Sequence, residues 1–226
     1  MPATTETLNQ IATTIPGATA VFRKYKLDFC CGGAVSLTEA AAAKGLDAET
    51  IAGELAALAP GETEAPREPV ALITHILTRY HEVHRRELPE LIRLAKRVEA
   101  VHGSRPDAPK GVAAILVTFA RELDDHMRKE EMVLFPIMED GGNDFIRHPI
   151  GVMRAEHTDA GDTLKQLEPF AGEPPADACP TWRALNAGLA KFVDDLMNHI
   201  HLENNVLFPT FETAGHSHEG CGCGGH

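Results

Sequence analysis

Apolar residues recur at helical spacing along most of the chain, and this pattern predicts an all-α protein. After a proline-containing stretch, four long amphipathic segments follow one another, at about 69–102, 109–140, 149–170 and 181–214. Proline lies near the start of each segment and glycine follows its end, as is usual for helices. Pro136 and Pro209 fall inside two of the segments and are expected to kink or end those helices. Four such helices with short connections predict an up-down-up-down four-helix bundle over residues 69–215.

The first 58 residues predict a separate, small helical domain. Its short amphipathic segments lie at about 5–13, 18–25, 37–44 and 48–58. Residues 59–68 combine prolines and charges without apolar periodicity, so they are predicted to be a linker. Residues 216–226, with the sequence HSHEGCGCGGH, are rich in glycine and are expected to form a flexible tail.

Charge and cysteine content restrict the classes of function. The net charge of −12 argues against a nucleic-acid-binding protein and against docking on an anionic membrane. No apolar run approaches the roughly 18–20 residues that span a bilayer, and the N-terminal residues do not resemble a secretory signal. Five cysteines, two of them adjacent, make a poor disulfide framework. A cytoplasmic protein is therefore expected. Twelve histidines in so acidic a chain are a first indication of metal.

One motif occurs twice, in the second and the fourth predicted helix of the bundle. The segment HMRKEEMVLFP begins at His126, and the segment HIHLENNVLFP begins at His199. Both have the pattern H-x3-E-x3-L-F-P. Each therefore places a histidine and a glutamate one turn apart on the same helical face. The glutamates are Glu130 and Glu203.

Each repeat follows a helix that offers another histidine, His81 before the first repeat and His157 before the second. In antiparallel hairpins these histidines would lie at the depth of the repeats, so that four imidazoles and two carboxylates converge in the core. A single zinc ion is satisfied by four ligands, and bridging carboxylates with imidazoles favour iron or manganese. The sequence predicts two non-haem iron ions with oxo and carboxylate bridges, held by His81, His126, Glu130, His157, His199 and Glu203.

Several neighbours of these residues are weaker candidates. His84 lies one turn after the first predicted ligand and is an alternative or additional ligand. Glu122 lies one turn before the first repeat and Glu156 directly precedes a predicted ligand, so both are candidates to orient ligands or relay protons. Glu131 is expected to be solvated, because it points about 100° away from the preceding glutamate. His201 is expected to face away from the site.

Adjacent thiols mark the N-terminal domain. Cys30 and Cys31 lie in the segment DFCCGG, where the glycines let the backbone approach closely and expose the thiols. They are candidates for an exchangeable metal ligand or a redox pair, and a tight turn of small residues is the alternative. In the tail, loose metal binding is a candidate role for His216, His218, Cys221, Cys223 and His226.

Five segments occur in an order typical of one known family. They are FRKYKLDFCCGG at 22–33, RYHEVHRRELPEL at 79–91, HMRKEEMVLFP at 126–136, EH at 156–157 and HIHLENNVLFP at 199–209. The chain thereby resembles the iron-sulfur cluster repair di-iron proteins, the YtfE/ScdA family, also called RIC. The resemblance implies a hemerythrin-like bundle with a cysteine-bearing N-terminal domain, and the same six iron ligands. The glycine-rich tail lies outside it.

The resemblance also implies a function, the repair of iron-sulfur clusters damaged by oxidative or nitrosative stress, through iron donation or through reaction with NO. Iron-sulfur client proteins and a homodimer are the implied partners, and Cys30 and Cys31 could receive iron. Three alternatives remain open. The protein could be an NO reductase that forms N2O, a hemerythrin-like carrier or sensor of O2 or NO, or an interaction bundle without metal.

Overall fold

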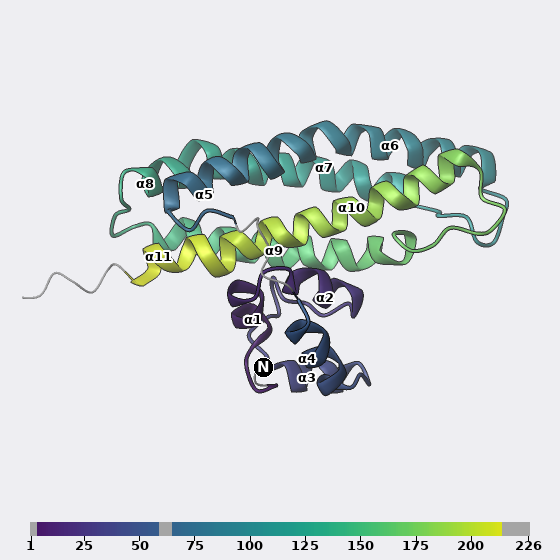
Figure 1. The fold of residues 1–226 in the computed structure, drawn as a ribbon. Helices are drawn as coiled ribbons and strands as arrows, with labels where there is room; N and C mark the ends of the chain where they lie inside the picture. Colours follow the sequence, from purple (N-terminus) through teal and green to yellow (C-terminus); the bar gives the residue numbers. More distant parts are fainter. Residues whose placement is uncertain (1–3, 59–64, 214–226) are drawn as a thin grey trace, which may run out of the picture.

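The computed structural model describes residues 4–58 and 65–213, and it confirms the all-helical architecture (Figure 1). Across these two ranges the β structure is limited to one isolated bridge between Thr7 and Ser36. The predicted tail and most of the predicted linker lie outside the described residues. Within the same ranges, no helix combines the length and the apolar character needed to cross a membrane.

Four short helices form the N-terminal unit: α1 (Leu8–Thr14), α2 (Ala18–Lys24), α3 (Leu37–Ala43) and α4 (Ala48–Ala56). Side chains cap the last two helices. The Ser36 hydroxyl accepts from the amide of Glu39, and the Asp47 carboxylate accepts from the amides of Glu49 and Thr50. Such caps satisfy amides that the first turn of a helix leaves unpaired.

The bundle is built from long helices with short continuations. In chain order these are α5 (Pro69–Ile76), α6 (Glu82–His102), α7 (Val112–Lys129), α8 (Phe135–Glu139), α9 (Arg147–Leu167), α10 (Pro180–Leu202) and α11 (Phe208–Thr213). A 3-10 turn, η3 (Glu168–Phe170), extends α9. In Figure 1 the helices run alongside one another, and α5, α8 and α11 gather at one end.

Three π-helical turns interrupt the bundle helices at the level of the predicted metal site. They are η1 (Leu77–His81), η2 (Glu130–Leu134) and η4 (Glu203–Leu207). The sequence predicted kinks or helix ends at Pro136 and Pro209. Instead, each proline is the second residue of a helix that continues directly after a π turn. Proline lacks an amide hydrogen and crowds the carbonyl four residues earlier, and the wider turn accommodates both effects.

A layer of polar side chains divides the bundle core into two apolar clusters. One cluster gathers at the end formed by α5, α8 and α11 and includes Ile76, Phe135 and Phe208. The other continues into the N-terminal unit, where Phe22 and Phe29 belong to the same buried cluster as the bundle residues. The predicted ligands lie between the two clusters in each helix. The predicted metal site therefore lies between the two clusters.

The N-terminal unit packs beside α9 and α10, as Figure 1 shows for α1 and α2. Arg23 forms an ion pair of 3.0 Å with Asp194 and donates a hydrogen bond of 3.2 Å to Asn198 on α10. The ring of Phe29 lies edge-on to the buried ring of His201, at 5.5 Å between centroids. These contacts hold the cysteine segment against the helix that carries the second repeat.

Candidate metal centre

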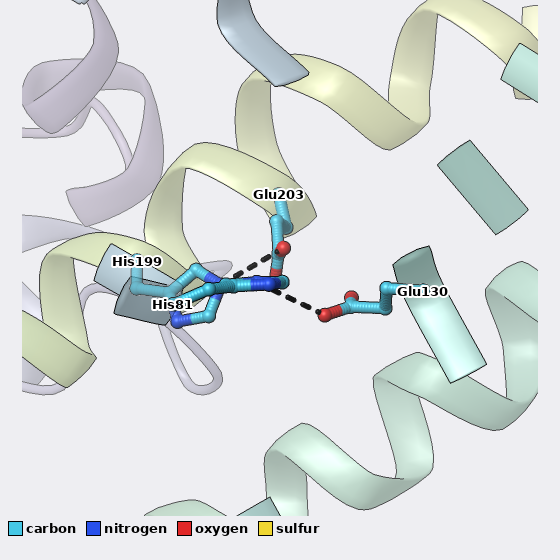
Figure 2. A group of neighbouring side chains, drawn as sticks. All are labelled: His81, Glu130, His199 and Glu203. Atoms are coloured by element: carbon cyan, nitrogen blue, oxygen red, sulfur yellow. Dashed lines mark hydrogen bonds and ion pairs between the residues drawn. The ribbon is translucent and has the colours of Figure 1, made fainter. Parts of the chain in front are cut away.

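All six predicted ligands lie together in the buried polar layer. Even His126, the most exposed of them, has only 6% of its surface accessible. Their ligand atoms form two groups, each with all its members within 4.8 Å of one another. The first group contains His81, Glu130, His199 and Glu203, and the second contains His126, Glu130, His157 and Glu203. Figure 2 shows the first group, in which the Glu130 carboxylate points toward the two imidazoles from another helix. Both carboxylates are common to the two groups.

The two oxygens of Glu203 approach histidines of different ligand groups. Its Oε1 lies 3.0 Å from Nε2 of His199, and its Oε2 lies 3.1 Å from Nε2 of His157. Each oxygen thus faces a histidine of a different group. Burial acts to raise the pKa of Glu203, but the neighbouring imidazoles of His199 and His157 outweigh it and hold that pKa well below its usual range.

Glu130 is in a different electrostatic situation. Its Oε2 lies 3.5 Å from Nε2 of His81 and 3.4 Å from Nε2 of His126. Neither carboxylate oxygen has a hydrogen-bond partner among the residues that the structure describes. Burial, together with the charge of Glu203, raises the pKa of Glu130 well above its usual range. A cation between the two carboxylates would remove this repulsion, so the donor set fits a metal.

Two of the imidazoles lie in surroundings that favour the neutral, metal-binding form. Burial, reinforced by a neighbouring imidazole in each case, lowers the pKa of His81 and that of His126 to about 4. The Nε2 atoms approach one another in pairs, at 3.1 Å between His81 and His199 and at 3.1 Å between His157 and His126. Four imidazole nitrogens and two carboxylates thus converge on one small volume.

Two of the predicted ligands contact a glutamate through Nδ1, the ring nitrogen that does not face the other ligands (called the outer nitrogen below). Nδ1 of His81 lies 2.8 Å from Oε1 of Glu131, which also pairs with Arg85 at 2.7 Å. The prediction that Glu131 is merely solvated is therefore wrong. The residue belongs to the π turn η2, where the spacing of side chains differs from 100° per residue, and its carboxylate reaches the facing helix. Nδ1 of His126 lies 2.9 Å from Oε2 of Glu156.

The outer nitrogens of the other two predicted ligands differ in their hydrogen-bond partners. Nδ1 of His157 lies 2.9 Å from Oδ1 of Asn204, a contact that sequence reasoning missed. Nδ1 of His199 has no partner in the described ranges, and neither has Nε2 of the buried His84. The His84 and His199 rings lie 5.5 Å apart, and His84 belongs to neither ligand group. His201 also stays outside both groups, with its Nδ1 accepting from Asn205 at 3.0 Å.

A cavity of about 490 Å³ adjoins the site. Its wall includes the ligands His126, His157 and His199 together with apolar residues such as Phe119 and Leu196. Glu122 and Glu156 also line it, next to Lys129, whose ammonium contacts the Glu156 carboxylate. Glu122 therefore lies in the wall of the cavity, and no contact of its carboxylate with a ligand nitrogen is found. A small molecule has space to reach the ligand nitrogens here.

The adjacent thiols lie against the second ligand group. Cys31 donates a hydrogen bond from Sγ to the carbonyl of His157, at 3.3 Å, and its Sγ lies 3.7 Å from that of Cys30. Together with Asp28 the two cysteines form a third group able to hold a metal ion. Contact with the Cys31 thiol, followed by burial, raises the pKa of Cys30. The expectation that the glycines expose both thiols is wrong for Cys30, which is buried, whereas Cys31 is partly exposed.

Comparison with known proteins gives two domain matches. Residues 72–211 match the family described as "Hemerythrin HHE cation binding domain", and residues 4–59 match ScdA_N, described as a domain of unknown function. Proteins named "Iron-sulfur cluster repair protein YtfE" are similar over nearly the whole chain. The protein of Cronobacter sakazakii is 50% identical over 207 residues, which is 89% of this chain and 94% of the relative. Those of Citrobacter koseri and Escherichia coli O8 are 48% and 47% identical over the same shares.

Proposed function

This chain belongs to the family of YtfE-type iron-sulfur cluster repair proteins with a hemerythrin domain, and from that membership we propose that it repairs iron-sulfur clusters damaged by oxidative or nitrosative stress. The proposal includes a centre of two iron ions. The observation that carries it is the pair of ligand groups that share Glu130 and Glu203. Two carboxylates common to two pairs of imidazoles suit two metal ions better than one.

Bound iron would supply exchangeable metal for a damaged cluster and open coordination positions for small ligands. The chain supplies two shared carboxylates, Glu130 and Glu203, and four imidazoles. Because the pKa of Glu130 is raised, a proton competes with the metal for this carboxylate. Such competition favours a centre that releases iron more readily than a site with fully ionised ligands. This suits iron donation.

Metal content and iron transfer test the proposal. The purified protein is expected to hold two iron ions per chain and to show a near-ultraviolet charge-transfer band typical of an oxo bridge. It should restore the absorbance of an iron-sulfur protein previously damaged with NO. A Glu130→Leu, Glu203→Leu double variant should lose both properties. The matched control replaces two exposed glutamates of α6, Glu82→Leu and Glu90→Leu, and should retain them. Zinc alone, or an equally well-folded protein without metal, would refute the proposal.

Reduction of NO to N2O is a second candidate function, favoured by the cavity beside His126 and His157. Apolar residues such as Phe119 and Leu196 form part of the wall and suit a small uncharged molecule, and Glu156 lies in the same wall beside the ligand His126. Formation of N2O over many turnovers with a reductant would support a reductase. A reversible O2 or NO adduct without turnover or iron loss would instead support a carrier or sensor.

The remaining parts of the proposal follow from the family. Cys30 and Cys31 are the candidates to receive iron that leaves the centre, because the Cys31 thiol contacts the ligand His157 and the Cys30 thiol lies beside it. A cytoplasmic homodimer acting on iron-sulfur client proteins is also proposed. Sedimentation of the iron-loaded protein tests the dimer, and iron transfer by a Cys30→Ser, Cys31→Ser variant tests the role of the thiols.

A further inference from the structure

A single side chain connects the cysteine segment with a predicted metal ligand. The side-chain amide of Asn204 makes two contacts, one through its oxygen and one through its nitrogen. Its Oδ1 lies 2.9 Å from Nδ1 of His157, and its Nδ2 donates a hydrogen bond of 3.2 Å to the carbonyl of Cys30. Asn204 is 7% exposed, so water has little access to replace either contact.

The cysteine segment touches the same ligand a second time. The Cys31 thiol donates to the backbone carbonyl of His157, and a Cβ added to Gly161, one turn later on α9, would lie 3.5 Å from that sulfur. This is an ordinary van der Waals distance, so the thiol packs closely against α9. Both the side chain and the backbone of His157 are thus in contact with residues 30–31 or with their partner.

Within the described ranges, none of the other predicted ligands is linked to the N-terminal unit in this way. The outer nitrogens of His81 and His126 contact Glu131 and Glu156, which belong to the bundle. Partners of this kind fix the orientation of a ligating histidine and its basicity. A shift of the cysteine segment would consequently act on the metal held by His126 and His157, and not on the metal held by His81 and His199.

We propose that Asn204 is a positioning residue that couples the cysteine segment 28–33 to His157, so that the position of this segment sets how tightly one of the two metal ions is held. This inference rests on the proposed iron centre. It makes the two ions unequal: one is retained by the bundle alone, and the other is released more easily when the segment moves. The mobile iron is then the one beside the thiols.

The structure offers a way to shift the segment without changing a ligand or a thiol. A Cβ at Gly33 would lie 2.5 Å from the carbonyl oxygen of Phe29, so Gly33→Ala must displace the backbone of this segment. The control is Gly53→Ala in α4, where an added Cβ meets nothing within 4 Å among the described atoms. Both variants are made in the full chain and loaded with iron.

The measurement is the rate at which an excess of a ferrous chelator removes each iron. Gly33→Ala is expected to speed the loss of one iron per chain at least about tenfold, since partners of ligating histidines contribute 10–100-fold to metal affinity. Mössbauer spectra should show one of two iron signals altered. Gly53→Ala should behave as the unmodified protein.

Asn204→Asp separates coupling from simple destabilisation. The new carboxylate keeps an acceptor for His157 but cannot donate to the carbonyl of Cys30. In this background Gly33→Ala should no longer affect iron loss, and the double-mutant cycle measures the coupling. An equal effect of Gly33→Ala in both backgrounds, or no effect in either, would overturn the inference.

A pair of buried asparagines provides a test that does not depend on the folding of Gly33→Ala. Asn204→Leu should speed the loss of one iron. Asn186→Leu should not, because Asn186, which is also 7% exposed, donates to the carbonyl of Gly172 at 2.9 Å and contacts neither a predicted ligand nor the cysteine segment. Equal rates in the two variants would refute the role of Asn204. If the unmodified chain bound no iron at all, the proposed function would fail before this question arose.

Discussion

Replacement of Glu130 by leucine should stabilise the metal-free protein while it abolishes metal binding. Glu130 is fully buried, and its two oxygens have no hydrogen-bond partner in the described part of the chain. An unsatisfied buried polar group costs about 1–3 kcal/mol. Leucine has a similar volume and no polar group that needs a hydrogen-bond partner. The free energy of unfolding of the metal-free protein should therefore rise by an amount in that range.

Thermal unfolding with and without iron measures both effects. For a chain of this size, 1 kcal/mol corresponds to roughly 2–4 °C in Tm, so Glu130→Leu should raise the Tm of the metal-free protein by several degrees. Iron should raise the Tm of the unmodified protein, as any ligand of the folded state does, and should leave that of the variant unchanged. The sign of the mutational effect therefore reverses when iron is added.

The neighbouring glutamate provides the matched control. Glu131 lies in the same π turn, but it is paired with Arg85 and His81. Glu131→Leu should not stabilise the metal-free protein. If Glu130→Leu lowered the Tm of the metal-free protein as well, the carboxylate would be held by protein contacts, and the argument that it is arranged for a cation would be refuted.

Three further predictions concern other residues. Glu156→Gln should weaken iron binding about 10–100-fold in chelator competition, because it removes the charged partner of His126, whereas Glu168→Gln, at the far end of α9, should have no effect. Burial lowers the pKa of His201 to about 4; the unfolded chain therefore takes up this proton first, and stability should fall as the pH decreases from about 6.5 to about 4. This acid sensitivity should be smaller in His201→Gln, and an unchanged unfolding-versus-pH profile would contradict the assignment. Asp47→Ala removes the cap of α4 and should cost about 1 kcal/mol in denaturant unfolding of the N-terminal unit, while Glu49→Ala should cost less.

The repeated H-x3-E pattern was sufficient to predict which helices face one another at the site. His126 and Glu130 lie one turn apart, and so do His199 and Glu203, and helical geometry then brings each pair to one face. The prolines near helix starts and the glycines after helix ends also predicted the bundle, because both residue types act locally through the backbone. These features depend on residues close in sequence, which one chain displays directly.

The partners of the ligands could not be predicted in the same way. Glu131 reaches His81 from a π turn, and a sequence read at 3.6 residues per turn places that carboxylate in solvent. Asn204 contacts both His157 and Cys30, which lie on segments far away in the chain. Only the packing of the N-terminal unit against η4 brings them together. A weak signal existed, since both repeats place a polar residue directly after the glutamate.

The division of the core by the polar layer has a consequence for the lifetime of the protein. Without metal, buried carboxylates and imidazoles separate the cluster around Ile76, Phe135 and Phe208 from the rest of the apolar interior. The end of the bundle built from α5, α8 and α11 then has little apolar continuity with the remainder and should open first. Proteases act on such locally opened segments. Chains that have lost their iron would thus be degraded sooner than iron-loaded chains, and the lifetime of the protein would depend on its metal content.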